Sequence, residues 1–424
     1  MLLAPHTTFA MAPTQFLNII IYMGHHESIF CSKIMQGFKL RESKILRKIL
    51  SKNSSEKNQE TTSLNQASEN STRQFYHQTK KILVGSWNIG GIAPPQNLNI
   101  EDWLHTQNDS ADIYVLGFQE IVPLNATNVL GPQNKKISMK WNSLIGETLN
   151  NKRPMKVVEE NKKAEHQKIY PLKERIYEEV ENVDDFQCII SKQMGGVFIT
   201  IWARCDLYQS IKHLNVSSVG CGVMGCLANK GSISIRFFLQ ETSFCFICSH
   251  LASGWKEEDK RQRNINAADI LSQTSFPAGP LHDMPQKIID HDRVVWLGDL
   301  NYRIDMPYSA TQLLIKRKEW KTLLKHDQLK MELKEGHVFE GWHEGDVEFP
   351  PTYKYLPNSD DYIGCVDEDM SKKRRSPAWC DRIIWFGKGM NQIQYNRSES
   401  KLSDHRPVQA MFTANIKVAA TNCK

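Results

Sequence analysis

The chain has 424 residues, of which 40% are hydrophobic and 24% charged, so it is long enough to bury at least one large core. Its formal net charge of +6 is modest for this length, which argues against the dense basic surface of a nucleic-acid binder but is compatible with phosphate-bearing partners. No run of about eighteen apolar residues occurs and the N-terminus lacks a signal-peptide pattern, so we expect a cytoplasmic protein without a membrane span.

Residues 1–72 are predicted to form a largely disordered N-terminal extension. Residues 52–78 are rich in Ser, Asn, Gln, Glu and Lys, which predicts a disordered tether because few contacts would offset the entropy of ordering it. Residues 39–52 place Leu and Ile near one helical face with Lys and Arg around it. Such a basic amphipathic helix can lie on an anionic membrane, dock a partner or be merely solvated, and the sequence leaves these alternatives open.

Strand-like apolar runs recur from residue 81 onward, and several are apolar on both faces. This pattern predicts sheets that pack against another sheet on one side and against helices on the other. The runs cover residues 81–87, 112–118, 196–203, 231–238, 243–250, 293–298, 382–386 and 406–412.

Amphipathic helices are expected over residues 138–149, 255–273 and 309–324. The charged segment over residues 150–185 is interpreted as a mobile, partly helical surface insertion. We therefore expect one domain over residues 73–417, followed by a short tail at residues 418–424.

The ten cysteines are scattered and lack the paired spacing of a zinc site, so free thiols are expected. Cys245 and Cys248 lie three positions apart in a predicted strand, so their side chains should point to opposite faces. That geometry argues against a shared metal.

Five short polar clusters follow apolar runs, where predicted strands end. If these ends converge on one rim, they gather the carboxylates, amides and histidines that a hard divalent cation and a phosphate would require. The clusters are Trp87 with Asn88, Gln119 with Glu120, Ser249 with His250, Asp299 with Asn301, and Ser403 with Asp404 and His405.

In this order the clusters resemble the metal-dependent phosphoesterase superfamily of deoxyribonuclease I, abasic-site endonucleases, neutral sphingomyelinases and inositol polyphosphate 5-phosphatases. The motifs WLGDLNYRI at residues 296–304 and SPAWCDRIIW at 376–385 resemble the two signatures of the inositol polyphosphate 5-phosphatases, and the chain looks like a plant-type member. The resemblance implies a four-layer α/β/β/α sandwich in which two mixed β-sheets pack face to face with helices outside. Further matches are SHLASG at 249–254, PTYKY at 351–355, NKG at 229–231 and SDHRPV at 403–408.

The resemblance also implies a metal site formed by Glu120, Asn88 and Asp404. Hard oxygen ligands without cysteine favour Mg²⁺ over zinc. A solvated loop carboxylate is the alternative for Glu120.

The catalytic roles implied by the resemblance fall first on Asp299, which would position or deprotonate the attacking water, and on Asn301, which would bind the phosphate. His250 would stabilise charge that develops on the transferred phosphoryl group. Phosphate monoester hydrolysis is so slow uncatalysed, with accelerations up to ~10²¹, that no single carboxylate could supply the catalysis.

His405 is implied to contact the phosphate oxygens, while Asp381 holds its ring in the working tautomer. A core salt bridge from Asp381 to Arg382 is the alternative.

Cations around the site are expected to set specificity, Arg by bidentate forks and Lys as a point charge. The match to PTYKY makes Lys354 the candidate for the phosphate next to the scissile one. The basic run at residues 372–375 is interpreted as a substrate contact, with a nuclear-localisation signal as the alternative, and Arg303 and Arg406 either contact phosphate or form scaffold ion pairs. The substrate-binding candidates are Lys230, Arg303, Tyr353, Lys354, Arg374, Arg375 and Arg406.

Two features depart from the expected pattern. Ala228 precedes the NKG motif where the family usually has glycine, which restricts the backbone but removes no candidate metal ligand. Acidic residues at 358–364 would oppose highly charged ligands if they faced inward.

The predicted function is Mg²⁺-dependent hydrolysis of the 5-phosphate of phosphoinositides, such as phosphatidylinositol 4,5-bisphosphate and 3,4,5-trisphosphate, or of soluble inositol 1,4,5-trisphosphate, by direct attack of water. Cys380 lacks the Cys-x₅-Arg cradle of cysteine phosphatases, so no covalent phosphoenzyme is expected. The rivals are a nuclease of the same fold, a catalytically silent phosphoinositide-binding module, and a scaffold that binds partners through residues 150–185. Peripheral contact with an anionic membrane is expected, no nucleic acid is expected as a partner, and a nuclear location stays an alternative.

Overall fold

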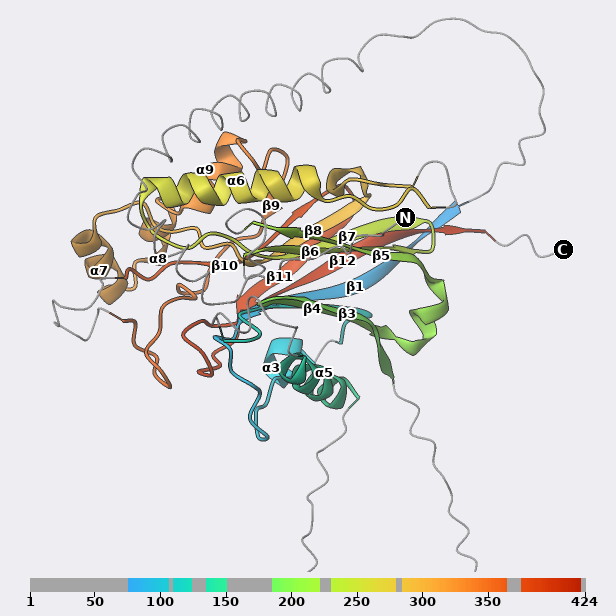
Figure 1. The fold of residues 1–424 in the computed structure, drawn as a ribbon, viewed down its shortest axis with the longest axis horizontal. Helices are drawn as coiled ribbons and strands as arrows, with labels where there is room; N and C mark the ends of the chain where they lie inside the picture. The colour runs from blue at the N-terminus through green and yellow to red at the C-terminus, as the bar shows by residue number, and fades with distance from the viewer. Residues whose placement is uncertain are drawn as a thin grey trace, which may run out of the picture. The chain divides into compact units, whose positions relative to one another are not determined.

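Two mixed β-sheets of six strands each form the centre of the fold in the computed structural model (Figure 1). Strands β1 and β2 pair in parallel, as do β7 and β8, and the other neighbouring pairs are antiparallel. The first sheet has the order β11 (Met390–Arg397), β12 (Val408–Ala419), β1 (Phe75–Asn88), β2 (Ile113–Gln119), β4 (Val197–Arg204) and β3 (Phe186–Met194). The second has the order β5 (Ile211–Gly220), β6 (Gly231–Leu239), β7 (Thr242–His250), β8 (Arg293–Asp299), β10 (Asp381–Phe386) and β9 (His343–Glu344).

The structure describes residues 75–106, 110–123, 135–150, 185–221, 230–279, 284–363 and 375–420. Several predictions lie outside these residues: the tether up to residue 74, the helix at 39–52, the insertion between Asn150 and Asp185, Ala228, and the basic run up to Arg374.

All eight predicted apolar runs form strands, as expected from their composition. The strands β3, β5, β9 and β11 were not predicted, and they occupy the four edges of the two sheets. Edge strands are partly exposed, so their sequences mix polar and apolar residues and show no apolar run.

The end of the predicted tether and the C-terminal boundary of the predicted domain need correction. The disordered tether was extended too far, because Phe75 to Gln78 form the start of β1 and pair with β12. These side chains are exposed, and the backbone ladder to Ala419 and its neighbours orders the segment without a buried apolar contribution. Strand β12 correspondingly continues two residues past the predicted boundary at 417.

The apolar core lies in three layers, because successive side chains of each central strand point to opposite faces. Between the sheets, Ile82 of β1 packs with Phe246 and Cys248 of β7. Cys245 belongs to the layer on the outer face of the second sheet, so the expected separation of the two thiols is confirmed.

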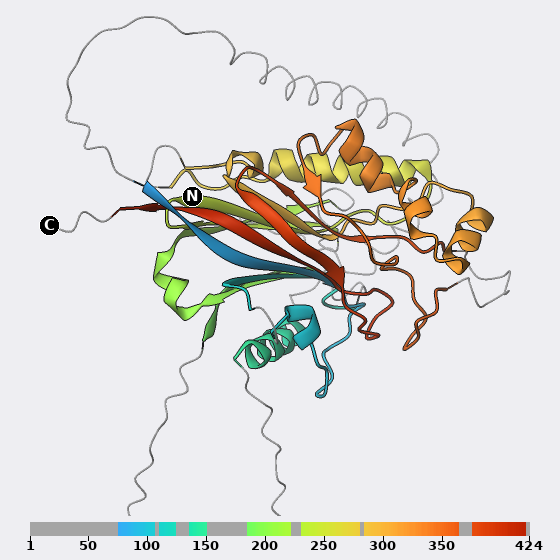
Figure 2. The same cartoon turned by 180° about the vertical axis from the view of Figure 1, so that it is seen from behind.

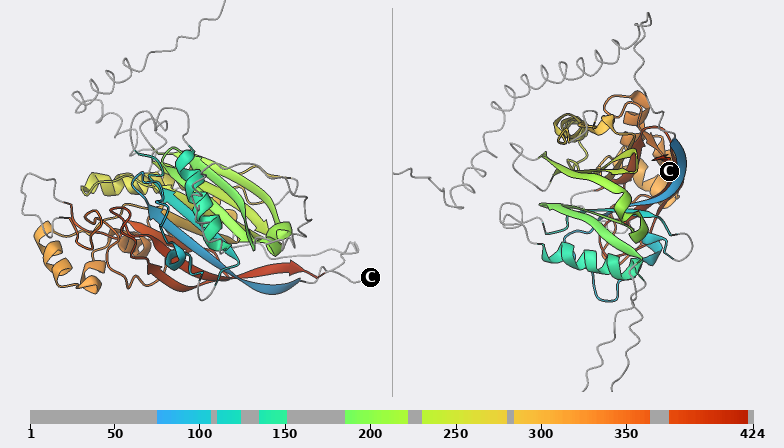
Figure 3. Two further views of the ribbon diagram at one scale, coloured as in Figure 1. Left: turned by 90° about the horizontal axis from the view of Figure 1, so that it is seen from below. Right: turned by 90° about the vertical axis from the view of Figure 1, so that its right-hand side faces the viewer.

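Helices cover the outer face of each sheet (Figures 2 and 3). Helices α3 (Glu101–Leu104) and α5 (Lys136–Leu149) pack on the first sheet through Trp103 and Trp141. Helix α6 (Glu257–Gln273) packs on the second sheet through Ala267 and Ile270, and the face is completed by α9 (Gln328–Glu335) through Leu329. The layer order α/β/β/α is therefore confirmed. Within the described residues, no helix is both long and apolar enough to cross a bilayer.

The single helix predicted over residues 309–324 is wrong. The structure has two helices there, α7 (Tyr308–Lys316) and α8 (Trp320–Leu324). Lys318 adopts a positive φ of 55° between them, which no helical residue can have. Short 3₁₀ segments, η1 (Cys205–Ser210) and η3 (Ile288–Asp290), complete the described elements.

The strand register brings polar residues from distant parts of the chain to one end of the sandwich. Asn88 pairs with Gln119 at the ends of the parallel strands β1 and β2. Asp299 pairs with His250 at the ends of the parallel strands β7 and β8, and with Asp381 at the start of the antiparallel β10. This end of the molecule therefore carries most of the predicted site.

Candidate active site

Asn88 links the two sheets at the centre of the site. Its Nδ2 donates to Oδ2 of Asp299 at 3.0 Å and contacts Oε1 of Glu120 at 3.4 Å. Its Oδ1 accepts from the backbone N–H of Gly90 at 3.1 Å, which fixes the orientation of the amide. The carboxylates of the two sheets thus lie on either side of one asparagine, although they are far apart in the sequence.

His250 and Lys230 lie beside Asp299. Nε2 of His250 is 3.2 Å from Oδ2 of Asp299, and Nζ of Lys230 contacts the same Nε2. Burial, assisted by the neighbouring ammonium, lowers the pKa of His250, so the imidazole is neutral near pH 7. Burial also lowers the pKa of Lys230 to about 8, although Asp299 opposes this shift. The predicted positions of His250 and Lys230 at one site with Asp299 therefore agree with the geometry.

Asp299 stays ionised despite being buried. Burial alone would raise its pKa, but His250, His405 and Lys230 together outweigh burial and hold the pKa well below its ordinary value. A carboxylate in this state accepts hydrogen bonds on both oxygens, and Oδ1 accepts one from the backbone N–H of Asn301 at 3.1 Å.

His405 and Asp381 form a second buried pair at the same end of the molecule. Nδ1 of His405 lies 2.8 Å from Oδ2 of Asp381, which also accepts from the hydroxyl of Thr352 at 2.7 Å. Burial opposes charge on the imidazole, but Asp381, assisted by Asp299 and Asp404, outweighs burial and raises the pKa of His405 to about 9. The alternative salt bridge to Arg382 is excluded, since that guanidinium instead pairs with Asp327 and Glu344.

Asn301 is held in an unusual backbone conformation next to Asp299. Its φ is 58°, which asparagine tolerates better than most residues. Its Nδ2 donates to the carbonyl of Leu251 at 3.2 Å, and the guanidinium of Arg303 contacts its Oδ1. Arg303 also lies 4.8 Å from the ring of Tyr353. Because its guanidinium contacts the Asn301 side chain, it supports Asn301 within the site.

The residues predicted to hold a metal form a set of hard oxygen donors. Glu120 follows β2, and the backbone N–H of Gly91 donates to its carbonyl at 2.6 Å. Gly90 lies beside Ser403 and Asp404, so the short loop after Asn88 brings Asp404 to the same place. The carboxylate of Asp404 forms an ion pair with the ammonium of Lys354. Its oxygen is therefore placed to contact a positive charge. Two carboxylates fit a hard divalent cation, and Asn88, whose Nδ2 faces Glu120 and whose Oδ1 accepts from Gly90, has only the second lone pair of Oδ1 to add.

Asp299, Asp381 and His405 also lie close together at this site, with ligand atoms within 4.8 Å of one another. Because Asp381 and His405 already bond to each other, we assign this group to hydrogen bonding rather than to metal binding.

Cationic and aromatic residues extend outward from His405. The ring of Tyr353 lies 4.5 Å from the His405 ring, and its hydroxyl accepts from Arg375 at 3.2 Å. The Arg375 guanidinium lies 6.0 Å from the ring of Trp255, whose side chain is 40% exposed. This path connects the buried pair of His405 and Asp381 to the surface.

Arg406 is engaged in the scaffold. Its guanidinium is buried, lies 3.8 Å from the ring of Tyr355 and donates to the carbonyl of Ser359 at 2.5 Å. The geometry therefore favours the scaffold alternative for Arg406 over a phosphate contact. The nearby Asp360 pairs with Lys401, so its charge is balanced on the surface.

Sequence reasoning did not identify Thr352, Trp255 or Tyr355 as parts of this end of the molecule. Thr352 and Tyr355 stand inside the PTYKY motif, which could have indicated both. Trp255 directly follows SHLASG, and a large apolar residue in a loop next to a catalytic motif was the available signal.

Comparisons with known proteins agree with this geometry. The family model described as Endonuclease/Exonuclease/phosphatase family 2 matches residues 85–411. The chain is 53% identical over 342 residues to Type IV inositol polyphosphate 5-phosphatase 9 of Arabidopsis thaliana, covering 80% of this chain and 78% of that protein. It is 47% identical over 347 residues to Type I inositol polyphosphate 5-phosphatase 8 of the same plant, covering 79% and 71%.

Among solved structures, the chain is similar to the inositol polyphosphate 5-phosphatase domain of SPsynaptojanin, crystallised with inositol (1,4)-bisphosphate and calcium. The match has a TM-score of 0.65 and 31% identity, and covers 81% of this chain and 87% of that one.

Proposed function

The chain belongs to the inositol polyphosphate 5-phosphatase family, and on that premise we propose that it removes the 5-phosphate from phosphoinositide lipids and soluble inositol polyphosphates by direct attack of water, with Mg²⁺ as the metal. The observation that carries this proposal is the central position of Asp299. His250 and Asn88 approach one of its oxygens, and the backbone of Asn301 holds the other. An ionised carboxylate fixed in this way is suited to orient a water molecule for in-line attack.

A bound Mg²⁺ would supply charge neutralisation at the phosphate and the leaving oxygen. Glu120, Asn88 and Asp404 are the residues that would hold it, and their oxygen donors favour a hard cation. Lys354, which contacts Asp404, would then be released to contact the phosphate next to the scissile one.

His405 would act on the phosphate as an imidazolium. Its raised pKa of about 9 keeps it protonated at neutral pH, and its bond to Asp381 leaves Nε2 as the second donor. Neutral His250 would keep Asp299 oriented as charge moves onto the phosphoryl group, and Asn301 would donate to a phosphate oxygen.

A covalent phosphocysteine is disfavoured. Cys380 is completely buried, and burial raises the pKa of its thiol far above the ordinary value. A neutral, inaccessible thiol is a poor nucleophile, which supports direct attack by water.

Lipid substrates are supported by the exposed Trp255 and the guanidinium of Arg375 beside it. An indole next to a cation suits the interface of an anionic bilayer, where the ring lies at the headgroup level. Both residues connect through Tyr353 to His405, so contact with a membrane here would deliver a headgroup to the site. We accordingly propose a cytoplasmic enzyme that contacts membranes peripherally. A nuclear location is the alternative proposal.

A phosphate-release panel tests the proposal. Inositol 1,4,5-trisphosphate, inositol 1,3,4,5-tetrakisphosphate and vesicles with phosphatidylinositol 4,5-bisphosphate or 3,4,5-trisphosphate would be compared with Mg²⁺ and with chelator. We expect release from the 5-position of soluble and lipid substrates in Mg²⁺ alone. Equal release with chelator would contradict the metal assignment, and release from no 5-phosphate would contradict the substrate class.

A further inference from the structure

Arg263 on helix α6 lies fully buried behind the loop that follows β7 and His250. Its side chain has an exposed fraction of 0%. NH1 donates to the carbonyl oxygen of Gly254 at 3.0 Å and to that of Ala252 at 3.3 Å. One arm of this guanidinium therefore fixes the path of the chain directly after a catalytic histidine.

The other arm reaches the loop that follows β8 and Asp299. NH2 of Arg263 donates to Oε1 of Gln328 at 2.8 Å. The same Oε1 accepts from the backbone N–H of Arg303, and the backbone N–H of Gln328 donates to the carbonyl of Arg303, each at 2.9 Å. Arg303 in turn donates from Nε to the carbonyl of Asn301 at 3.0 Å. A continuous set of hydrogen bonds thus runs from Arg263 to Asn301.

Neighbouring residues of α6 hold the same two loops. Oδ1 of Asn264 accepts from the hydroxyl of Tyr302 at 2.7 Å, and Oδ1 of Asn266 accepts from the backbone N–H of Ala252 at 3.1 Å. The Arg263 guanidinium also lies 5.6 Å from the ring of Tyr302. One face of the helix therefore supports both loops, with Arg263 as the member that contacts both.

Both loops require such support. Asn301 has a positive φ of 58°, a conformation that neighbouring contacts must maintain. Its Nδ2 donates to the carbonyl of Leu251, so a shift of either loop displaces the amide at the phosphate position. A displacement of about 1 Å at a reacting group can lower a rate by roughly 10²-fold.

We propose that Arg263 is a positioning residue for the hydrolytic reaction, which it supports by fixing the His250 and Asn301 loops relative to each other through Gly254, Ala252 and Gln328. It touches neither substrate nor metal. The expected effect on kcat rests on the proposed function, whereas the expected effect on the structure of the two loops rests on the fold alone.

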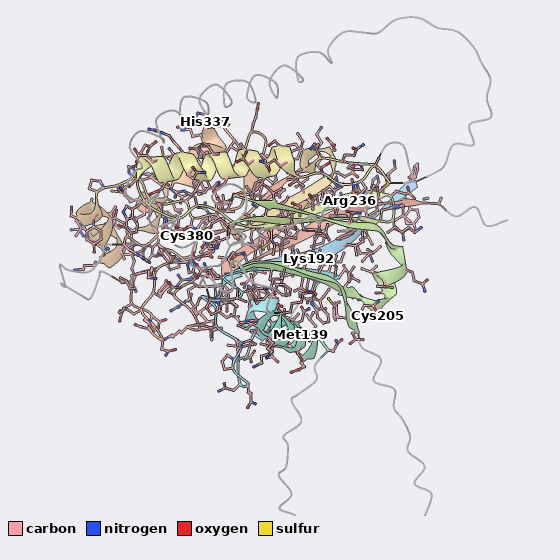
Figure 4. All side chains as sticks on the ribbon, viewed as in Figure 1. Met139, Lys192, Cys205, Arg236, His337 and Cys380 are labelled. Atoms are coloured by element: carbon pink, nitrogen blue, oxygen red, sulfur yellow. The ribbon has the colours of Figure 1, made fainter. Side chains whose placement is uncertain are left out.

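Arg236 on β6 provides a matched control. It is also buried, donates to two backbone carbonyls, those of Pro285 at 2.6 Å and Pro277 at 2.7 Å, and lies 5.3 Å from the ring of Phe276. In the ladder between β6 and β7, Arg236 pairs with Cys245, whereas Gly231 pairs with His250 at the end that carries the site. Arg236 therefore lies away from the site. Figure 4 accordingly shows Arg236 well along the sheet from Cys380.

The experiment compares Arg263→Ala with Arg236→Ala in the full chain. We expect similar losses of Tm, but a fall in kcat on inositol 1,4,5-trisphosphate of roughly 10- to 100-fold for Arg263→Ala alone, as when a residue supporting a catalytic group is removed. Arg263→Ala combined with Gln328→Ala should cost little more kcat than Arg263→Ala alone, because both act through one set of hydrogen bonds. If either alanine variant fails to fold, Arg263→Lys and Arg236→Lys replace the pair, with the same criteria.

Amide hydrogen exchange gives a readout that needs no substrate. Exchange at Leu251, Asn301 and Arg303 should rise in the Arg263 variant and stay unchanged in the Arg236 variant. Equal kcat losses in the two variants, or unchanged exchange in the Arg263 variant, would overturn the proposal. A wild-type protein that releases no phosphate would count against the proposed substrate, while the exchange experiment would still decide the role of Arg263.

Discussion

Nδ1 of His405 and Oδ2 of Asp381 lie 2.8 Å apart, and both side chains are buried. The carboxylate fixes the ring and stabilises its protonated form, while the hydroxyl of Thr352 occupies the same oxygen. One oxygen of Asp381 thus determines both the orientation and the charge of the imidazole, a division of roles that gives the site a defined pH dependence.

The first prediction concerns that pH dependence in protein treated with chelator. The pKa of His405 is raised to about 9 in the folded state from 6.5, so pairing with Asp381 stabilises the fold fully below about pH 6.5 and the contribution disappears as pH rises through 9. Each pKa unit corresponds to about 1.4 kcal/mol, so the loss amounts to a few kcal/mol. Urea unfolding between pH 6 and 10 measures it.

Asp381→Asn is the control for this prediction. The asparagine keeps the size and the contact with Thr352 but removes the charge, so the loss of stability between pH 6.5 and 9 should be much smaller, with only Asp299 and Asp404 left to favour the imidazolium. The same pH slope in wild type and variant would show that His405 is not the titrating group.

The second prediction concerns Asp299. Asp299→Ala should lower kcat by about 10⁴-fold, on the scale of removing a catalytic side chain that acts as part of a unit, and should leave the secondary structure intact. Circular dichroism and phosphate release measure the two effects. Asp299→Asn should be comparably inactive although it can retain the contact to the backbone of Asn301, so wild-type turnover in either variant would refute the assigned role.

The third prediction concerns the metal. Glu120→Gln keeps an oxygen donor but removes a charge, so the Mg²⁺ concentration for half-maximal activity should rise by roughly 10- to 100-fold. A Mg²⁺ titration of phosphate release measures the shift. Glu147→Gln is the matched control and should leave the titration unchanged, because Glu147 is a partly exposed carboxylate on α5 that accepts from the hydroxyl of Ser143. An unshifted curve for Glu120→Gln would return Glu120 to the solvated-carboxylate alternative.

The central strands could be predicted from the sequence because they are buried on both faces. Residues 81–87 and 243–250 are nearly uniform apolar runs, and each forms the predicted strand. The edge strand β5 could not be predicted in this way, because only one side of it is covered and its burial alternates irregularly. Backbone pairing to β6, which no local pattern encodes, defines it.

The position of a site residue could be predicted where its motif lies at the end of a predicted strand. Asp299 and His250 meet because β7 and β8 are parallel and in register, so local sequence and topology agree. The role of Arg263 was not predictable, because its partners lie up to 65 positions away and include backbone carbonyls, which every residue carries. Arg406 shows the same limit, since a cation near a motif suits a phosphate and a scaffold equally.

The fourth prediction separates lipid from soluble substrates. The side chain of Trp255 is 40% exposed and lies beside Arg375, whereas Asp299 and His405 are buried. Trp255→Ala should therefore lower hydrolysis of phosphatidylinositol 4,5-bisphosphate in anionic vesicles by roughly tenfold, since an interfacial indole contributes on the order of 1–2 kcal/mol, while turnover of inositol 1,4,5-trisphosphate stays near the wild-type value.

Leu313 on α7 provides the control for Trp255, because it is a comparably exposed apolar side chain, at 49%, on a different element. Leu313→Ala should change neither activity. Vesicle sedimentation of the two variants separates weaker membrane binding from slower chemistry. If Trp255→Ala lowered both activities equally, the indole would support the site itself, and the proposal of lipid substrates would lose its structural basis. If it lowered neither, membrane contact would have to come from another surface, and residues 39–52, whose deletion can be assayed on the same vesicles, would be the next segment to test.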